Sequence, residues 1–80
     1  MTSKEMFEQL GYIQIENNEE EIKYRREWLE QASDYIYFEL RHKRYGAYFR
    51  ELGYFMCLSI SLEEYKAITQ QLKELGWLDE

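Results

Sequence analysis

The sequence predicts an α+β fold: an antiparallel sheet of about four to five strands, with a short N-terminal helix and a longer C-terminal helix packed on one face. Apolar residues alternate with a period of two through the middle of the chain, whereas helical spacing is clearest in residues 2–10 and 61–76. A motif that ends helices or reverses strands, Leu-Gly followed by an aromatic residue, recurs at residues 10–12, 52–54 and 75–77. Helices that flank antiparallel strands pack together on one side of the sheet.

The composition limits the architecture to one small domain, residues 1–80. Aromatic residues make up 18% of the chain, so large rings must supply much of the core. The single cysteine, Cys57, excludes an internal disulfide, and no leader pattern is present, so we expect a cytoplasmic location. No apolar stretch approaches the ~20 residues of a membrane span, and we expect no membrane partner.

The first elements are a helix and a hairpin. Thr2 and Glu5 have the spacing of a capping box, and the helix that follows should end at Gly11. Residues 12–16 alternate as a strand, an Asn-Asn pair supplies turn chemistry, and alternation resumes at residues 22–28. A helix over residues 19–32 is the alternative, because apolar residues there also fit a 3.6-residue period.

The clearest strand is residues 35–40, with Ile36, Phe38 and Leu40 expected to face the core. A basic turn at residues 41–44 leads into a strand over 45–50. A tight reversal then leads into a last strand over 54–60, which should place Met56, Leu58 and Ile60 on one face. The alternative for residues 43–52 is a short helix.

The final helix begins with a capping box, Ser61 to Glu64, in whose first turn acidic side chains should be solvated. Its apolar stripe is expected to comprise Leu62, Tyr65, Ile68, Leu72 and Leu75. The helix should end at Gly76, with Trp77 and Leu78 folding back over its end.

The sheet face opposite the helices is the first candidate site. If Ile36 and Phe38 point toward the helices, Tyr35 and Tyr37 point away, as do Phe55 and Cys57 on the last strand. An aromatic patch with charges around it is typical of a binding surface. The alternatives are rings that merely cover the sheet, or self-association into a homodimer through this face or a sheet edge.

The second candidate site is the basic segment, residues 41–50, which carries a charge of +4 in a chain whose net charge is −6. Cations interleaved with rings can hold phosphates and stack bases of single-stranded nucleic acid. They can equally contact an acidic protein surface. The predicted partner-binding residues from both sites are Tyr35, Tyr37, Arg41, Lys43, Arg44, Tyr45, Tyr48 and Arg50.

Catalytic and metal-binding patterns are not evident. His42 and Cys57 are the only residues of their types, too few for the usual structural zinc site, and no glycine-rich phosphate loop is present. We therefore expect no catalysis, no metal and no cofactor.

Residues 5–12, 35–40, 60–68 and 74–77 resemble small uncharacterised proteins encoded by phages and prophages of low-GC Gram-positive bacteria. The resemblance implies an accessory protein that binds a host or phage protein. Because the chain outside residues 41–50 has a charge of −10, inhibition of a nucleic-acid-handling defence enzyme by acidic mimicry is one form of this function. The alternative is single-stranded nucleic-acid binding through residues 41–50.

Overall fold

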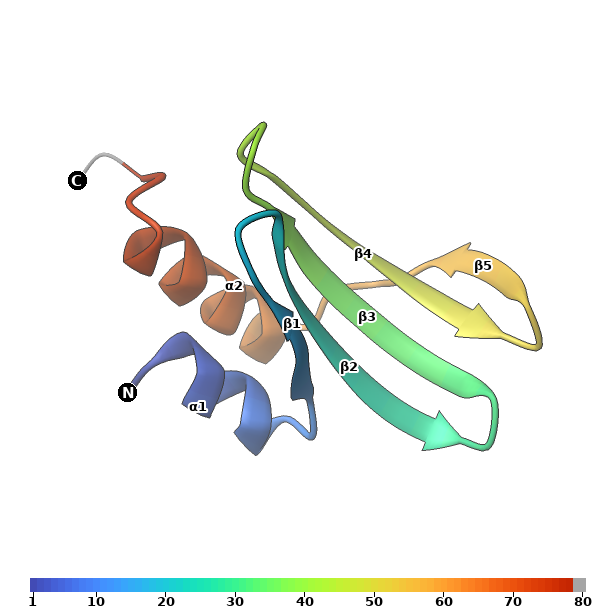
Figure 1. The fold of residues 1–80 in the computed structure, drawn as a ribbon. Coiled ribbons are helices and arrows are strands. Elements are labelled where there is room, and N and C mark those ends of the chain that lie inside the picture. The colour runs from blue at the N-terminus through green and yellow to red at the C-terminus, as the bar shows by residue number, and fades with distance from the viewer. Residues whose placement is uncertain (79–80) are drawn as a thin grey trace.

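The computed structural model describes residues 1–78 and confirms the predicted α+β fold (Figure 1). Five strands follow each other in chain order, and each pairs antiparallel with the next. Both helices pack on the same face, at one end of the sheet. In chain order the elements are α1 (Ser3–Gln9), β1 (Ile13–Asn17), β2 (Glu21–Leu29), β3 (Ala32–Glu39), β4 (Arg44–Glu51), β5 (Tyr54–Cys57) and α2 (Leu62–Glu74).

A helix was the alternative prediction for residues 19–32 and 43–52, and both segments form strands. Residues 21–29 pair along β3 on one side and with β1 on the other, and residues 44–51 pair with β3 and β5. The middle Leu-Gly-aromatic motif is a two-residue hairpin turn, with φ values of 49° at Leu52 and 86° at Gly53. Positive φ at both central residues is the type I′ geometry, whose twist matches that of the flanking strands.

The core is built from stacked rings. Phe7 of α1 stacks on Tyr24 of β2 with 4.1 Å between ring centroids, and Tyr12 meets Phe7 edge-on at 5.7 Å. Phe38 of β3 completes the cluster. The Leu-Gly motif after α1 explains the position of Tyr12, whose backbone N–H donates to the Phe7 carbonyl at 3.0 Å. Trp77 returns in the same way to Leu72 after α2.

The predicted apolar stripe of α2 was wrong in its first turn. Leu62 and Tyr65 are 62% and 57% exposed, whereas Glu64 and Gln71 are buried together with Ala67 and Ile68. Glu64 was expected to be solvated. The helix is rotated because both polar side chains find partners in the interior: Gln71 Oε1 accepts from the Tyr24 hydroxyl at 2.8 Å and from the Ser3 hydroxyl at 3.0 Å.

The last strand is shorter than predicted. β5 ends at Cys57, because the chain then leaves the sheet to reach the N-cap of α2 at Ser61. Leu58 packs against the core, but Met56 is 48% exposed and Ile60 is also exposed. Leu78 is likewise exposed rather than sealing the end of α2.

A buried ion cluster lies where α2 meets the sheet. One terminal nitrogen of Arg26 contacts the carboxylates of Asp34 at 2.7 Å and Glu64 at 2.8 Å, and both acids are almost fully buried. The Trp28 indole donates to Asp34 at 2.6 Å and the Tyr12 hydroxyl to Glu64 at 2.6 Å. Each buried carboxylate therefore has both a cation and a neutral donor, as buried charges require.

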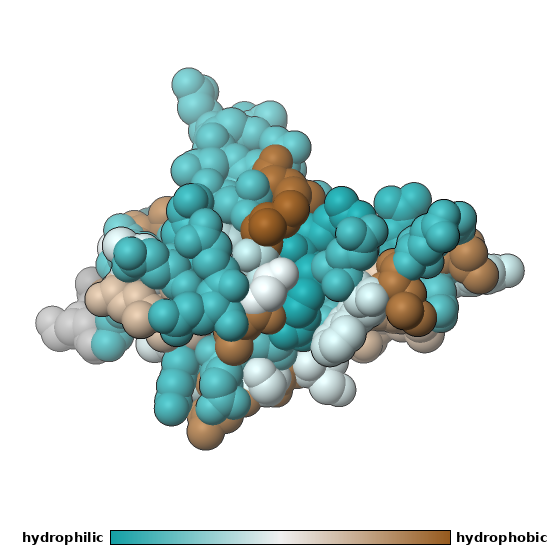
Figure 2. Space-filling view, turned by 90° about the horizontal axis from the view of Figure 1, so that it is seen from below, coloured by the Kyte–Doolittle hydropathy of each residue, from teal (hydrophilic) through white to brown (hydrophobic). Residues whose placement is uncertain are grey.

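Beyond this cluster the sheet continues without helices over it. The β2–β3 and β4–β5 hairpins extend away from α1 and α2, to the right in Figure 1. We call residues 27–33 and 49–57 the projecting end. Apolar groups reach its surface, as Figure 2 shows at the right. Its exposed large apolar side chains are Trp28, Leu29, Leu52, Tyr54, Phe55 and Met56. Neither helix within residues 1–78 is long and apolar enough to cross a membrane.

Candidate functional site

The aromatic side chains predicted for the uncovered sheet face do lie there. Tyr35 pairs with Tyr48 across β3 and β4, and Cys57 of β5 pairs with Tyr48. Directly opposed residues share a face of the sheet. Ile36 and Phe38, which alternate with Tyr35 and Tyr37 along β3, point the other way, into the core under the helices. We call this uncovered side of the sheet the open face.

On the open face, three rings from β3 and β5 lie against the central ring of Tyr48 on β4. Tyr35 and Tyr48 stack with centroids 4.7 Å apart and an interplanar angle of 17°. Tyr37 lies 6.1 Å from Tyr48, and Phe55 meets Tyr48 edge-on at 5.6 Å. We call Tyr35, Tyr37, Tyr48 and Phe55 the aromatic row. Because its rings brace one another, the row is a preformed surface rather than a set of independent side chains.

Gly46 explains how Tyr37 reaches its position. A Cβ atom at residue 46 would lie 2.5 Å from the Tyr37 hydroxyl oxygen and 2.7 Å from the ring carbon that carries it. The Tyr37 ring therefore lies flat across the opposing strand, in the space that any other residue would fill. The missing side chain at Gly46 therefore lets the Tyr37 ring extend over β4.

The charges beside the aromatic row have opposite signs at its two ends. A hollow of about 400 Å³ near the projecting end is lined by Arg25 and Arg50 together with Tyr35 and Ser33. A second hollow of about 440 Å³, at the other end, is lined by Glu20, Glu21 and Glu39 with Lys23, Tyr37 and Tyr48. The open face is thus basic at one end, aromatic in the middle and acidic at the other.

The cations on the open face are held in different ways. Arg25 donates to the Ser33 hydroxyl at 3.2 Å and pairs with Glu27 at 3.2 Å. Lys23 lies 3.4 Å from Glu21. Burial lowers the pKa of Lys23, but its neighbours Tyr48 and Glu21 outweigh this effect and leave the pKa raised, so the ammonium stays charged. The guanidinium of Arg50 lies over the Phe55 ring, 5.8 Å from its centroid.

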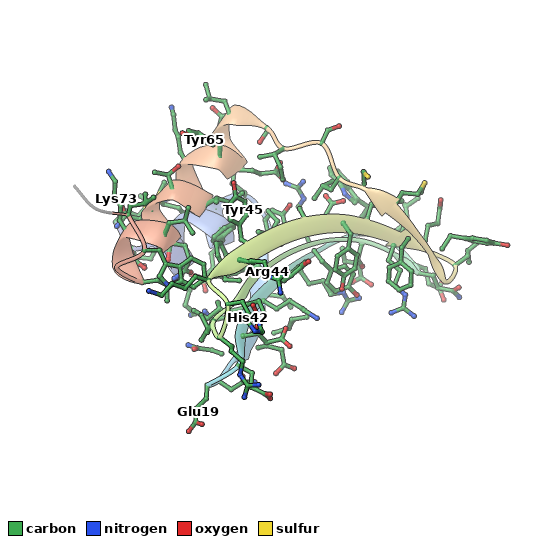
Figure 3. All side chains as sticks on the ribbon, turned by 90° about the horizontal axis from the view of Figure 1, so that it is seen from above. Glu19, His42, Arg44, Tyr45, Tyr65 and Lys73 are labelled. Atoms are coloured by element: carbon green, nitrogen blue, oxygen red, sulfur yellow. The ribbon has the colours of Figure 1, made fainter. Side chains whose placement is uncertain are left out.

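The predicted basic segment is not one surface. Tyr45 pairs with Phe38 and lies on the helix side, as Figure 3 shows, with 6.1 Å between the two ring centroids. Tyr48 lies on the open face because it is three residues further along the same strand. Arg41 and Lys43 belong to the exposed turn before β4, and Arg44 lies 3.9 Å from Glu39.

The structure therefore gathers five of the predicted binding residues on the open face, because Arg44 directly opposes Glu39 there: Tyr35, Tyr37, Arg44, Tyr48 and Arg50. Lys23 and Arg25 were not among the predicted residues, because the sequence of β2 fits both a strand and a helix. The alternation of Ile22 and Tyr24 is the signal that could have identified this pair. Because those two side chains face the core, Lys23 and Arg25 must lie on the opposite face of the sheet.

His42 and Cys57 do not come together. His42 lies in the turn before β4, where its ring nitrogen Nδ1 is 3.0 Å from Glu39, whereas Cys57 is exposed opposite Tyr48 in the middle of β4. Among residues 1–78, no group of three or more His, Cys, Asp or Glu side chains is arranged to hold a metal ion.

No family model matches this chain, and no curated protein or solved structure does. The open face carries the aromatic row and the two charged hollows beside it. Its geometry and charge are therefore the basis for a functional conclusion.

Proposed function

We propose that the protein is an accessory factor that acts by binding a host or phage protein through its open face, without catalysis. The partner contacts the aromatic row with an apolar patch and places an acidic side chain near Arg25 and Arg50. The observation that carries this proposal is the aromatic row itself: three rings packed around Tyr48 on a sheet face that neither helix of residues 1–78 covers.

Aromatic and arginine side chains fit this role on energetic grounds. Binding energy at protein interfaces concentrates in tyrosine, tryptophan and arginine residues, which combine a large apolar area with a polar group. Rings that are already stacked lose little conformational entropy on binding. The opposite charges at the two ends of the row would fix the orientation of the partner.

The geometry supports a protein partner better than single-stranded nucleic acid. Tyr45 and Tyr48 lie on opposite faces, so one strand of nucleic acid cannot stack on both. Lys23, Arg25 and Arg44 lie beside glutamates that compete with phosphates for them. An acidic hollow at one end of the row also opposes a polyanion.

Photo-crosslinking in host lysate tests which face is used. The photoreactive residue p-benzoylphenylalanine replaces Tyr37 in one protein and Tyr45 in a matched control on the other face of the same sheet. We expect a discrete crosslinked protein from position 37, unchanged by nuclease, and none from position 45. Equal crosslinking from both positions would contradict docking through the open face.

A pair of charge reversals tests the basic hollow. Arg50→Glu should reduce capture of the crosslinked partner at least tenfold, whereas Arg41→Glu, in the exposed turn, should leave capture within twofold. A labelled oligonucleotide is titrated in parallel at about 50 mM salt, where nucleic-acid contacts are strongest. Tight oligonucleotide binding that Tyr48→Ala abolishes would replace the proposed protein partner with nucleic acid.

A further inference from the structure

The two edge strands of the sheet differ in how they are protected. β1 has a β-bulge between Gln14 and Glu16, and it carries an acidic side chain. β5, with the sequence Tyr-Phe-Met-Cys, has no bulge, charge or proline, and all four of its residues are exposed. Bulges and charges are the usual means of preventing edge strands from pairing with another chain. Only β1 has them.

The hairpin turn decides which backbone groups of β5 face outward. In an antiparallel ladder, hydrogen-bonded pairs alternate with pairs that are not hydrogen-bonded. A two-residue turn is flanked by a hydrogen-bonded pair, which here is Glu51 with Tyr54. Tyr54 and Met56 therefore direct their backbone groups toward β4, and Phe55 and Cys57 direct theirs toward the free edge.

We propose that β5 pairs antiparallel with β5 of a second copy of this chain, about a two-fold axis at Met56. This register places Phe55 opposite Cys57 of the second copy, and Cys57 opposite its Phe55, so that all outward backbone groups of both residues are hydrogen-bonded. Met56 then faces its own counterpart in the pair without hydrogen bonds. The result is a continuous ten-stranded antiparallel sheet.

A second copy suits this edge better than a foreign strand, because the edge is complementary to itself. β5 carries no charge, so two copies meet without like-charge repulsion between directly opposed residues. Tyr54 and Phe55 are 75% and 66% exposed and Met56 is 48% exposed. At about 200 Å² for each large side chain, this is roughly 400 Å² per copy.

Even with all of this area and the edge backbone covered, the pair would bury at most the ~1,000 Å² that marks the lower limit of specific interfaces. We therefore infer a weak dimer whose population depends on concentration. A two-fold axis perpendicular to the sheet keeps both open faces on the same side. The two aromatic rows would then lie next to each other, although dimerisation itself does not depend on what the open face binds.

Disulfide trapping tests both the dimer and its register. Opposed residues in a pair without hydrogen bonds have Cα atoms about 4.5 Å apart, within the range of a disulfide. Met56→Cys in a Cys57→Ser background should therefore form a covalent dimer under mild oxidation. The control, Tyr54→Cys in the same background, places an exposed cysteine on the same strand but four residues out of register with its counterpart.

The native Cys57 is a second internal control. In the proposed register the two Cys57 residues are diagonal neighbours, about 7–8 Å apart, which is too far for a disulfide without backbone movement. The unchanged protein should crosslink at least tenfold more slowly than the Met56→Cys, Cys57→Ser protein. Equal crosslinking at positions 54, 56 and 57 would overturn the proposed pairing.

Sedimentation velocity at rising concentration measures the dimer without crosslinking. The unchanged protein should shift from monomer toward dimer, and Met56→Asp should abolish the shift by opposing two carboxylates across the axis. Tyr54→Asp adds the same charge away from the axis and should retain dimers. Urea unfolding of each variant confirms that its fold is intact. A protein that stays monomeric at about 1 mM would refute the proposal.

Discussion

The covered end of the sheet and its projecting end are built from the same strands but differ in what lies over them. At the covered end, rings from α1, β2 and β3 are fully buried beneath two helices. At the projecting end, β2 carries Trp28 and Leu29, and β5 carries Phe55, into solvent. The Arg26 cluster lies between the two ends and joins β2, β3 and the first turn of α2.

This difference separates stability from surface function. Buried rings at the covered end hold the fold together, so substitutions there act on folding. Apart from Trp28, whose indole donates to Asp34, the exposed apolar side chains of the projecting end contribute little to folding and are available for partners. An α+β domain of this size can therefore extend a sheet beyond its core, provided that a well-satisfied polar cluster closes the core where the helices end.

The largest expected contrast comes from the same substitution at the two ends. Phe38→Ala removes a fully buried ring and should lower the free energy of unfolding by about 3–5 kcal/mol, enough to unfold much of the protein. Phe55→Ala should cost about 0.5 kcal/mol or less. Urea unfolding followed by circular dichroism measures both. Similar losses at the two positions would show that the projecting end belongs to the core.

A smaller contrast separates two neighbouring arginines. Arg26→Met leaves Asp34 and Glu64 buried without their cation, and we expect a loss of about 3 kcal/mol. Arg25→Met removes an exposed ion pair with Glu27 and should cost about 0.5 kcal/mol. The same urea titrations compare them. Equal losses of stability would mean that the Arg26 cluster contributes no more to folding than a surface ion pair.

The third prediction is the dependence of stability on pH. Burial raises the pKa of Glu64, but hydrogen bonds from Ser61 and Tyr12, and the charge of Arg26, outweigh burial and leave the pKa below its ordinary value of 4.5. A carboxyl with a lowered pKa stabilises the fold above its unfolded pKa, and this stability is lost as the pH falls through the folded value. Unfolding midpoints should therefore decrease below pH 4.5.

Glu64→Gln isolates this contribution, because glutamine can still form the capping box with Ser61 but carries no charge. The variant should be less stable than the unchanged protein at pH 7 and should lose less on acidification. Glu74, whose pKa is also lowered, remains in both proteins and provides the common background. Parallel pH profiles for the two proteins would exclude Glu64 as a source of acid sensitivity.

The sequence predicted the layers of this fold because they depend on local signals. Capping boxes, the Leu-Gly motif and two-residue alternation each act within a few residues, and the aromatic open face followed from alternation in β3 and in the last strand. The rotation of α2 could not be predicted in this way. Glu64 and Gln71 are buried by partners 38 to 68 residues away in sequence, and hydropathy patterns carry no information about such partners.

The candidate site was predicted in part for the same reason. Tyr35 and Tyr37 follow from one clear strand, but the choice between helix and strand over residues 43–52 decided whether Tyr45 and Tyr48 share a surface. A helix would have brought them together, and the strand separates them. Lys23 and Arg25 join the site only through pairing of β2 with β3, which depends on register between strands.

The order of the strands has a consequence for how the chain folds. Each strand pairs with its neighbour in sequence, so every ladder can form by closing a short loop. The contact between α1 and α2 is different, since it joins the two ends of the sequence: Ser3 meets Gln71 and Glu74. Rapid growth of the sheet from any hairpin, followed by slower docking of the helices, is the folding sequence that this topology favours.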